Sequence, residues 1–159
     1  MTWATGMTGK RLVVRGMQRY WRMTRALTLG AQGCVLDNAE RVLLIRHTYR
    51  PGWHFPGGGV EVSEPVEVAL ARELAEETGV IVDGRPQLFG LYDNQRLFRG
   101  DHIVLFVVRR WSQPSVPPAN REIAEQRFFT ASELPADINP ATATRVAEVL
   151  EGRAPAQMW

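Results

Sequence analysis

Apolar residues alternate with small and polar ones along several short runs of the chain, a pattern that favours β-strands. Residues 27–36 and 41–46 form two such runs with the polar segment 37–40 between them, so we expect a hairpin. Further strands are predicted over residues 86–92, 102–111 and 123–129. Because residues 103–108 are apolar without a break, the strand that contains them is expected to lie in the centre of a sheet.

Two segments carry the signals of helices. Residues 65–78 predict the first helix, with Ser63 or Glu64 as the candidate N-cap and Gly79 closing the C-terminus. A last helix is expected over residues 139–151, which open with Asn-Pro. Mixed strands with two main helices predict an α/β layered architecture.

The composition allows one globular domain. Of the 159 residues, 45% are hydrophobic, which is enough for one core but not for a second full domain. We expect this domain over residues 25–151, followed by a loose tail over residues 152–159. The sequence shows neither a membrane-spanning run of roughly 18 apolar residues nor a signal-peptide core, so the expected location is cytoplasmic. Cys34, the single cysteine, excludes an internal disulfide and is predicted to be buried in a strand.

The net charge of +2 conceals a basic N-terminal arm over residues 1–24. The basic residues that precede the first acidic residue, Asp37, are Lys10, Arg11, Arg15, Arg19, Arg22 and Arg25. We interpret the arm as a short helix packed on the domain, since Leu12, Tyr20, Trp21 and Thr24 have spacings that suit one helix side. A contact surface for nucleic acid or another polyanion, and a targeting segment, are the alternatives.

Three glutamates in the first predicted helix gather on one face. Glu73, Glu76 and Glu77 stand at i, i+3 and i+4, so their side chains leave the helix in the same direction. We expect these like charges to repel one another and to destabilise the helix, whereas a cation that prefers oxygen ligands, such as Mg²⁺, would stabilise them. A solvated acidic face is the simpler alternative. The glycine turn at residues 56–59 and Arg72 beside the cluster favour metal binding.

Residues 58–80 resemble the Nudix box. Its pattern is glycine, five residues, glutamate, seven residues and then R-E-U-x-E-E-x-G-U, where U is aliphatic. Every defined position is filled, by Gly58, Glu64, Arg72, Glu73, Leu74, Glu76, Glu77, Gly79 and Val80. The resemblance implies a Nudix-type α/β/α sandwich with a mixed β-sheet, in which a loop-helix-loop segment carries the metal site.

The resemblance also implies a reaction and a division of roles. The reaction is an Mg²⁺-dependent hydrolysis, with Mn²⁺ as the alternative ion, in which water attacks phosphorus in the diphosphate linkage of a nucleoside diphosphate derivative or nucleoside triphosphate. The residues that the resemblance assigns to the metal are Glu73, Glu76, Glu77 and Gly58, the last through its carbonyl oxygen. Arg72 would hold Glu73 or Glu64 in place rather than contact the substrate, and Glu64 would lie outside the metal's direct ligands.

The general base stays open, because in this family it lies in the box or on a later loop. Glu76 or Glu77 is our first choice, with Glu122 and Glu125 as alternatives. No pair of histidines has the helical spacing of a zinc site. His54 and His102 are instead predicted to be strand residues near the pocket.

Substrate contacts are predicted on both sides of the box. Arg46, Arg50 and Trp53 precede the glycine turn, where guanidinium groups suit phosphate and an aromatic ring suits a base. Phe98 stands near the position where related enzymes that cleave dinucleoside polyphosphates carry a tyrosine. The marks of the individual subfamilies are mostly missing, so the sequence leaves the substrate undecided.

Two function classes compete for this pattern. The first is a hydrolase acting on a small nucleotide, with room for a homodimer and without a membrane partner. The second is a Nudix-like ligand-sensing or RNA-binding module with little catalysis, in which the basic arm contacts nucleic acid. Modules of that kind tend to lose box carboxylates, and all of them are present here, which favours the hydrolase.

Overall fold

The computed structural model describes Met17, Tyr20 and residues 27–159. The predicted basic arm therefore lies outside the described residues, apart from Met17 and Tyr20, which belong to a helix. Within the described part of the chain, no helix is long and apolar enough to span a membrane.

The strands form two main sheets and one small pair. The strands of the main sheets are β1 Thr28–Val35, β2 Val42–His47, β3 Trp53–His54, β4 Gly57–Gly59, β6 Gln87–Asp93, β7 Asp101–Val108 and β9 Ile123–Phe129. The first sheet has the order β4-β1-β7-β6 and the second the order β3-β2-β9. In the first sheet β1 and β7 run parallel while the other pairs are antiparallel, so it is the expected mixed sheet. The small pair joins β5 Ile81–Val82 to β8 Trp111–Ser112, which separates the predicted strand 102–111 into β7 and β8.

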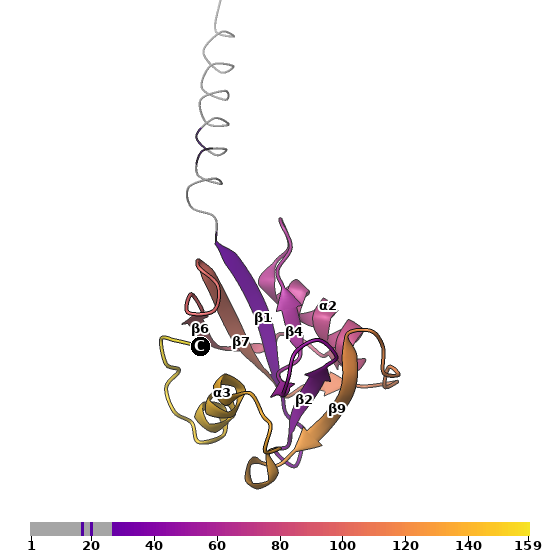
Figure 1. Cartoon of the computed structure of the whole chain (residues 1–159). Coiled ribbons are helices and arrows are strands. Elements are labelled where there is room, and N and C mark those ends of the chain that lie inside the picture. The colour runs from indigo at the N-terminus through magenta and orange to yellow at the C-terminus, as the bar shows by residue number, and fades with distance from the viewer. Residues whose placement is uncertain (1–16, 18–19, 21–26) are drawn as a thin grey trace, which may run out of the picture.

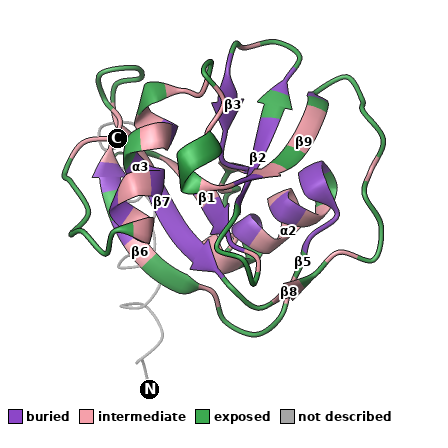
Figure 2. Cartoon of the chain, turned by 90° about the horizontal axis from the view of Figure 1, so that it is seen from below, coloured by how far each residue is buried: buried purple, intermediate pink, exposed green. Residues whose placement is uncertain are grey.

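Helix α2, Val66–Thr78, and helix α3, Pro140–Leu150, lie on opposite sides of the strands (Figure 1). Alternate residues of β7 face the two helices: Val107 belongs to the same apolar cluster as Val146 of α3, and Phe106 belongs to that of Leu70 in α2. Figure 2 shows β7 buried along most of its length. An unbroken apolar run suits a strand that is covered on both faces, and the α/β/α sandwich with a central 103–108 strand is confirmed.

The predicted hairpin is only half right. The turn forms, because the Asp37 carboxylate accepts hydrogen bonds from the amides of Ala39 and Arg41, both at 2.9 Å. The strands beside it nevertheless enter different sheets and share only an isolated bridge between Leu36 and Val42. Strand β1 already has β7 on one edge and β4 on the other, so β2 finds its partners in β3 and β9.

Three ends of α2 and α3 agree with the sequence: Gly79 ends α2, Asn139 begins α3, and Glu151 is the C-cap of α3. Gly79 closes α2 with φ 75° and donates to the carbonyl of Ala75 at 3.0 Å, and Asn139 caps α3 by accepting from the amides of residues 141 and 142. The predicted side-chain cap of α2 is wrong: the cap is Pro65, which makes no side-chain bond. The Glu64 carboxylate does not cap the helix because it binds Arg72. A short 3-10 helix, Ala131–Glu133, precedes α3.

The tail over residues 152–159 is not loose. The Asp93 amide donates to the Gln157 carbonyl at 2.8 Å, and the Trp159 amide donates to the Asp93 carbonyl at 3.0 Å. The Trp159 ring lies edge-on to Tyr92, with ring centroids 5.2 Å apart. The prediction failed because the tail gains its order by pairing with the end of β6, which no local periodicity reveals.

Candidate active site

Strand β4 brings the glycines of the box against β1 and α2. Gly57 has φ 139°, and a Cβ atom there would lie 2.2 Å from the carbonyl oxygen of Ala31. A Cβ on Gly58 would lie 2.5 Å from the carboxylate of Glu73. Glycine is therefore required at Gly57 for the approach to β1, whereas a side chain at Gly58 would displace the Glu73 carboxylate that packs beside it.

Arg72 holds two of the box carboxylates at once. Its Nε and Nη2 donate to the two oxygens of Glu64, each at 3.0 Å, and its Nη1 donates to Glu73 Oε1 at 2.7 Å. The hydrogen bond from Arg72, with that from the Glu61 amide, lowers the pKa of Glu64. The sequence left open whether Arg72 holds Glu73 or Glu64, and the structure shows that it holds both. Such a forked contact fixes direction as well as charge.

Glu77 is the buried carboxyl of the site. Its Oε2 accepts a hydrogen bond from the Gly57 amide at 2.7 Å. Burial raises the pKa of Glu77 to about 7, and the Gly57 amide and Arg50 oppose this rise while the charges of Glu73 and Glu122 add to it. A carboxyl with a pKa near neutrality can take and release a proton at physiological pH.

Four glutamates line one cavity of about 390 Å³, which we call the carboxylate cavity: Glu73, Glu76, Glu77 and Glu122, together with Asn120, Arg121 and Ile123. Helix α2 supplies the first three, and the segment before β9 supplies Glu122. Of the two later candidates for the base, the structure therefore brings Glu122 to the box. Glu125 does not line this cavity and pairs with Arg127 at 2.7 Å.

The donor set of the carboxylate cavity suits a hard divalent cation, although its side chains are turned to other partners. Among the described residues, no three Asp, Glu, His or Cys side chains are arranged to hold a metal ion as they lie. Glu73 is bound by Arg72, and Glu77 by the Gly57 amide. The donors are nevertheless all oxygen atoms, and a cation would offset the burial and the neighbouring carboxylate charges that together raise the pKa of Glu77. The residues thus fit such an ion once their carboxylates turn toward it.

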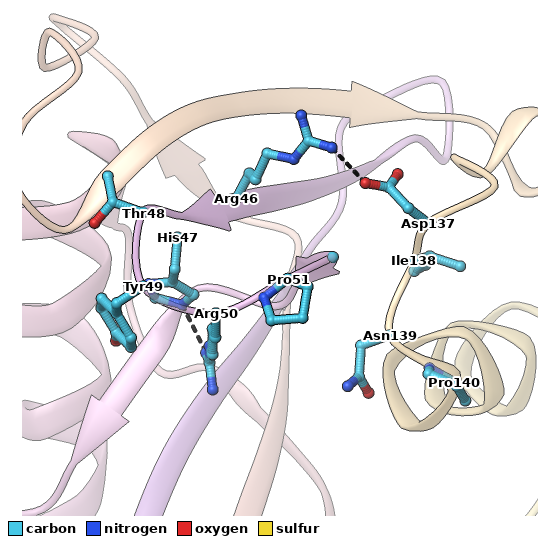
Figure 3. A pocket seen from close by; sticks show the side chains of 11 residues that line it. Arg46, His47, Thr48, Tyr49, Arg50, Pro51, Asp137, Ile138, Asn139 and Pro140 are labelled. Atoms are coloured by element: carbon cyan, nitrogen blue, oxygen red, sulfur yellow. Dashed lines mark hydrogen bonds and ion pairs between the residues drawn. The ribbon is translucent and has the colours of Figure 1, made fainter.

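Two of the predicted phosphate contacts line a second cavity, of about 600 Å³, which we call the loop cavity (Figure 3). It lies at the loop after β2. Arg46 is paired there with Asp137, while Arg50 Nη2 lies 2.6 Å from Nε2 of the buried His47. Because a guanidinium can only donate, His47 Nε2 is the acceptor. Arg46 is therefore tied to a carboxylate, and Arg50 is anchored beside the box.

The two predicted aromatic contacts lie away from these cavities. Trp53 is 4% exposed, and its ring packs edge-on against Phe129 with centroids 4.9 Å apart. Its indole belongs to the core, so it offers no face on which a base could stack. Phe98 is 61% exposed in the loop between β6 and β7 and lines neither the carboxylate cavity nor the loop cavity.

Sequence reasoning missed a third cavity, of about 500 Å³, beside the first turn of α3; we call it the α3 cavity. Its walls include Gln32, Arg50, His54, Met158 and Trp159. His54 lies near a pocket as predicted, whereas His102, a residue of β7, lines none of these three cavities. Gln32 carried a usable signal, because it is a polar residue in the middle of a buried strand. Trp159 carried none, since it reaches the cavity only through the pairing of the tail with β6.

The mixed sheet lies between two helices. At one edge of the sheet, the glycines of β4 meet α2, whose carboxylates are held by Arg72. This arrangement is that of the Nudix-type hydrolases. The sequence matches the NUDIX domain over residues 27–149. The chain therefore belongs to the NUDIX family.

Individual relatives agree with this assignment. The chain is 31% identical over 128 residues to a MutT-like protein of Streptomyces ambofaciens, a match that covers 80% of each chain. It is 41% identical over 71 residues to the uncharacterized Nudix hydrolase YvcI of Bacillus subtilis, which covers 45% of this chain and 44% of that one. The crystal structure of a MutT NUDIX hydrolase from Burkholderia pseudomallei has a TM-score of 0.66 and 25% identity, covering 77% of this chain and 97% of that chain.

Proposed function

We propose that the protein is an Mg²⁺-dependent pyrophosphohydrolase that cleaves the diphosphate linkage of a nucleoside diphosphate derivative or nucleoside triphosphate by attack of water at phosphorus. The observation that carries the proposal is the convergence of Glu73, Glu76, Glu77 and Glu122 on one cavity. Surface glutamates spread along a helix would not meet a fourth carboxylate from a segment more than 40 positions away in the sequence.

The box residues supply a binding place for the ion. Mg²⁺ would neutralise the diphosphate, activate the attacking water and stabilise the leaving phosphate. The residues that would hold it are Glu73, Glu76, Glu77 and the carbonyl of Gly58. Arg72 contacts Glu73 and Glu64, and this contact supports a role in positioning the carboxylates rather than in binding substrate. Glu64 would then act through Arg72.

Glu77 is the box residue whose surroundings best suit proton transfer. It is buried beside the other box carboxylates, and the Gly57 amide holds its Oε2 in place. Glu76 is largely exposed, with a 3.6 Å contact to Arg72, and it remains the second candidate of the box. Glu122 is supported as the alternative base because it lines the same cavity, whereas the pairing of Glu125 with Arg127 speaks against that residue.

Arg50 is the residue we propose for contact with substrate phosphate. It lines both the loop cavity and the α3 cavity. Its charge is also close enough to Glu77 to oppose the rise in the pKa of that carboxyl. A guanidinium in this position can bind a phosphate oxygen while the ion binds the diphosphate. The homodimer and the contact of the basic arm with nucleic acid stay predictions from the sequence.

The test is a panel of nucleoside triphosphates, nucleoside diphosphate sugars and dinucleoside polyphosphates, assayed with Mg²⁺, with Mn²⁺ and with EDTA. We expect metal-dependent cleavage that falls at least about 100-fold in Glu77→Gln and Glu76→Gln. Glu151→Gln is the matched control, because Glu151 caps the far end of α3 and pairs with Arg153.

A second readout needs no turnover. Mg²⁺ that binds only the folded protein should raise the melting temperature of the wild type and of Glu151→Gln, but less so in Glu77→Gln. Failure to cleave any substrate on the panel would favour the ligand-sensing module. Full activity in both box variants would remove these glutamates from the mechanism.

A further inference from the structure

The α3 cavity adjoins the proposed catalytic carboxylates through the strand pair β1 and β4. Gln32, which lines the cavity, is the register partner of Gly57, and the amide of Gly57 binds Glu77. Arg50 lines the cavity from the loop before β3. A substrate whose diphosphate lies at the carboxylate cavity therefore has about 500 Å³ close by for its organic group, within the range that small-molecule sites occupy.

One wall of this cavity is formed by Met158 and Trp159, at the end of the segment 156–159. Backbone hydrogen bonds tie this segment to Asp93 at the end of β6, and the Met158 carbonyl accepts from Arg145 Nη1 at 2.7 Å. The segment is thus held by the sheet on one side and by α3 on the other. Met158 and Trp159 both line the cavity.

A buried ion pair anchors the segment from beneath. Arg145 and Glu148 have side chains that are 5% and 6% exposed, and their closest atoms lie 2.8 Å apart. Glu148 also accepts hydrogen bonds from the Tyr92 hydroxyl at 3.0 Å and from the Ala156 amide at 3.3 Å. A buried charged pair adds little to net stability compared with apolar packing, but here its hydrogen bonds specify where the segment lies.

Strand β6, which residues 155–159 cross, has a glycine at the point of closest approach. A Cβ atom on Gly90 of β6 would lie 2.7 Å from the Cβ of Pro155. The ladder between β6 and β7 shifts its register between Leu88 and Gly90. Glycine at this position therefore lets residues 155–159 pass close to the sheet, and two independent features, the anchor and the glycine, fix the same wall.

The chemistry of the wall suits a flat heterocycle. Trp159 is an aromatic residue that is only partly buried and lines the cavity, while the edge-on contact of its ring with Tyr92 holds it in place. The side-chain oxygen of Gln32 is buried without a hydrogen-bond partner, and such an oxygen is satisfied by an N–H donor. Nucleobases combine a π-face with N–H groups on their edges, whereas a sugar phosphate has no π-face.

We propose that residues 156–159 are a fixed wall of the substrate site and that Trp159, with Gln32, recognises the nucleobase of the substrate. This inference rests on the proposed function for the position of the diphosphate. It makes Trp159 a specificity-determining residue, because the ring contacts the base and not the phosphates.

Binding of product-like ligands tests the proposal without turnover. Calorimetry would compare AMP, GMP, CMP, UMP and ribose 5-phosphate on the wild type, Trp159→Leu and Trp111→Leu. Trp111 is the matched control, since it stacks on Phe128 and does not line the α3 cavity. We expect the wild type and Trp111→Leu to bind at least one nucleotide 10-fold or more tightly than ribose 5-phosphate, and Trp159→Leu to lose that preference while its affinity for ribose 5-phosphate is unchanged.

Two further variants keep the test decisive. Gly90→Ala should displace the wall without removing Trp159 and should weaken nucleotide binding in the same way, even if Trp159→Leu does not fold. Gln32→Leu should reduce the discrimination among the four nucleotides. A wild type that prefers no nucleotide to ribose 5-phosphate, or a folded Trp159→Leu that keeps its preference, overturns the proposal.

The outcomes separate this proposal from the proposed function. A protein that cleaves the panel with rates insensitive to Trp159 would retain its hydrolase assignment and lose the base-binding wall. A protein that binds nucleotides through Trp159 but cleaves nothing would retain the wall and lose the hydrolase assignment.

Discussion

Residues of one type act differently here because their surroundings differ. Glu64 has a lowered pKa because Arg72 donates two hydrogen bonds to it, whereas burial raises the pKa of Glu77. Both belong to the same box, and their spacing in the sequence does not distinguish them. The roles that we propose for them, outer carboxylate and proton carrier, therefore rest on solvation and partners.

His47 supports a prediction about pH. Burial, with the nearby charges of Arg50 and His54, lowers the pKa of His47 to about 4, while the Glu122 backbone opposes this shift. The unfolded chain then binds more protons than the folded one between pH 6.5 and 4. Stability that is fully present above pH 6.5 is lost as the pH falls through this window, by up to about 3 kcal/mol.

Urea unfolding at several pH values between 7 and 4.5 would measure this loss. His47→Gln should flatten the pH dependence of the free energy of unfolding, and His102→Gln, which removes a histidine from β7, is the matched control. Part of the slope will persist in His47→Gln, because burial also lowers the pKa of His54. An unchanged slope in His47→Gln would contradict the assignment.

Among the elements, α2 is the one whose position decides the site. Its apolar residues Ala69, Leu70 and Leu74 are fully buried against the sheet. Glu73 and Glu76 lie beside this buried face and line the carboxylate cavity. The left-handed residue Gly79 ends the helix close to the loop after β8. Packing on one side and a sharp end therefore fix the direction of the acidic face.

Gly79→Ala should destabilise the fold by more than the replacement of a left-handed glycine that has free space around it. A Cβ atom at Gly79 would lie 2.1 Å from the carbonyl oxygen of Ser115, so strain and collision add, for a loss of about 2 kcal/mol or more. Gly152→Ala is the control: φ is 65° there and nothing lies within 4 Å of the added atom, so about 1 kcal/mol is expected. Thermal or urea unfolding measures both, and equal losses would show that the contact with Ser115 is unimportant.

At the scale of the whole molecule, β7 and the Arg145–Glu148 pair join parts that are distant in sequence. Strand β7 packs against both helices through its alternating side chains. The ion pair connects α3, β6 and residues 156–159 through hydrogen bonds. These contacts close the side of the sandwich on which the α3 cavity lies.

Breaking this pair on one side should be worse than replacing it entirely. Arg145→Met leaves the Glu148 charge buried without its partner, so we expect a loss of about 3–5 kcal/mol, whereas the double variant Arg145→Met/Glu148→Met should lie much closer to the wild type. The exposed pair Arg110–Asp83 is the control and should change stability by less than about 1 kcal/mol. A double-mutant cycle measures the coupling, and strictly additive losses would contradict it.

Local patterns predicted much of the fold. The central strand, both main helices, the glycine end of α2 and the turn at Asp37 depend on apolar periodicity, caps and turn residues that lie within a few positions of one another. The misassigned features have the opposite character. Strand β2 lies in another sheet than predicted, the tail is ordered by its pairing with β6, and Trp53 lies in the core. Each of these features depends on partners far along the chain.

The same division holds for the site. The sequence by itself determined that three carboxylates share one helix face behind a glycine turn, because helix geometry converts spacing into direction. Only the tertiary structure decided that Glu77 is buried with a raised pKa, that Glu122 joins the carboxylate cavity, and that Trp159 lines the α3 cavity. Burial, electrostatic coupling and cavity shape are properties of segments brought together, and no single segment carries them.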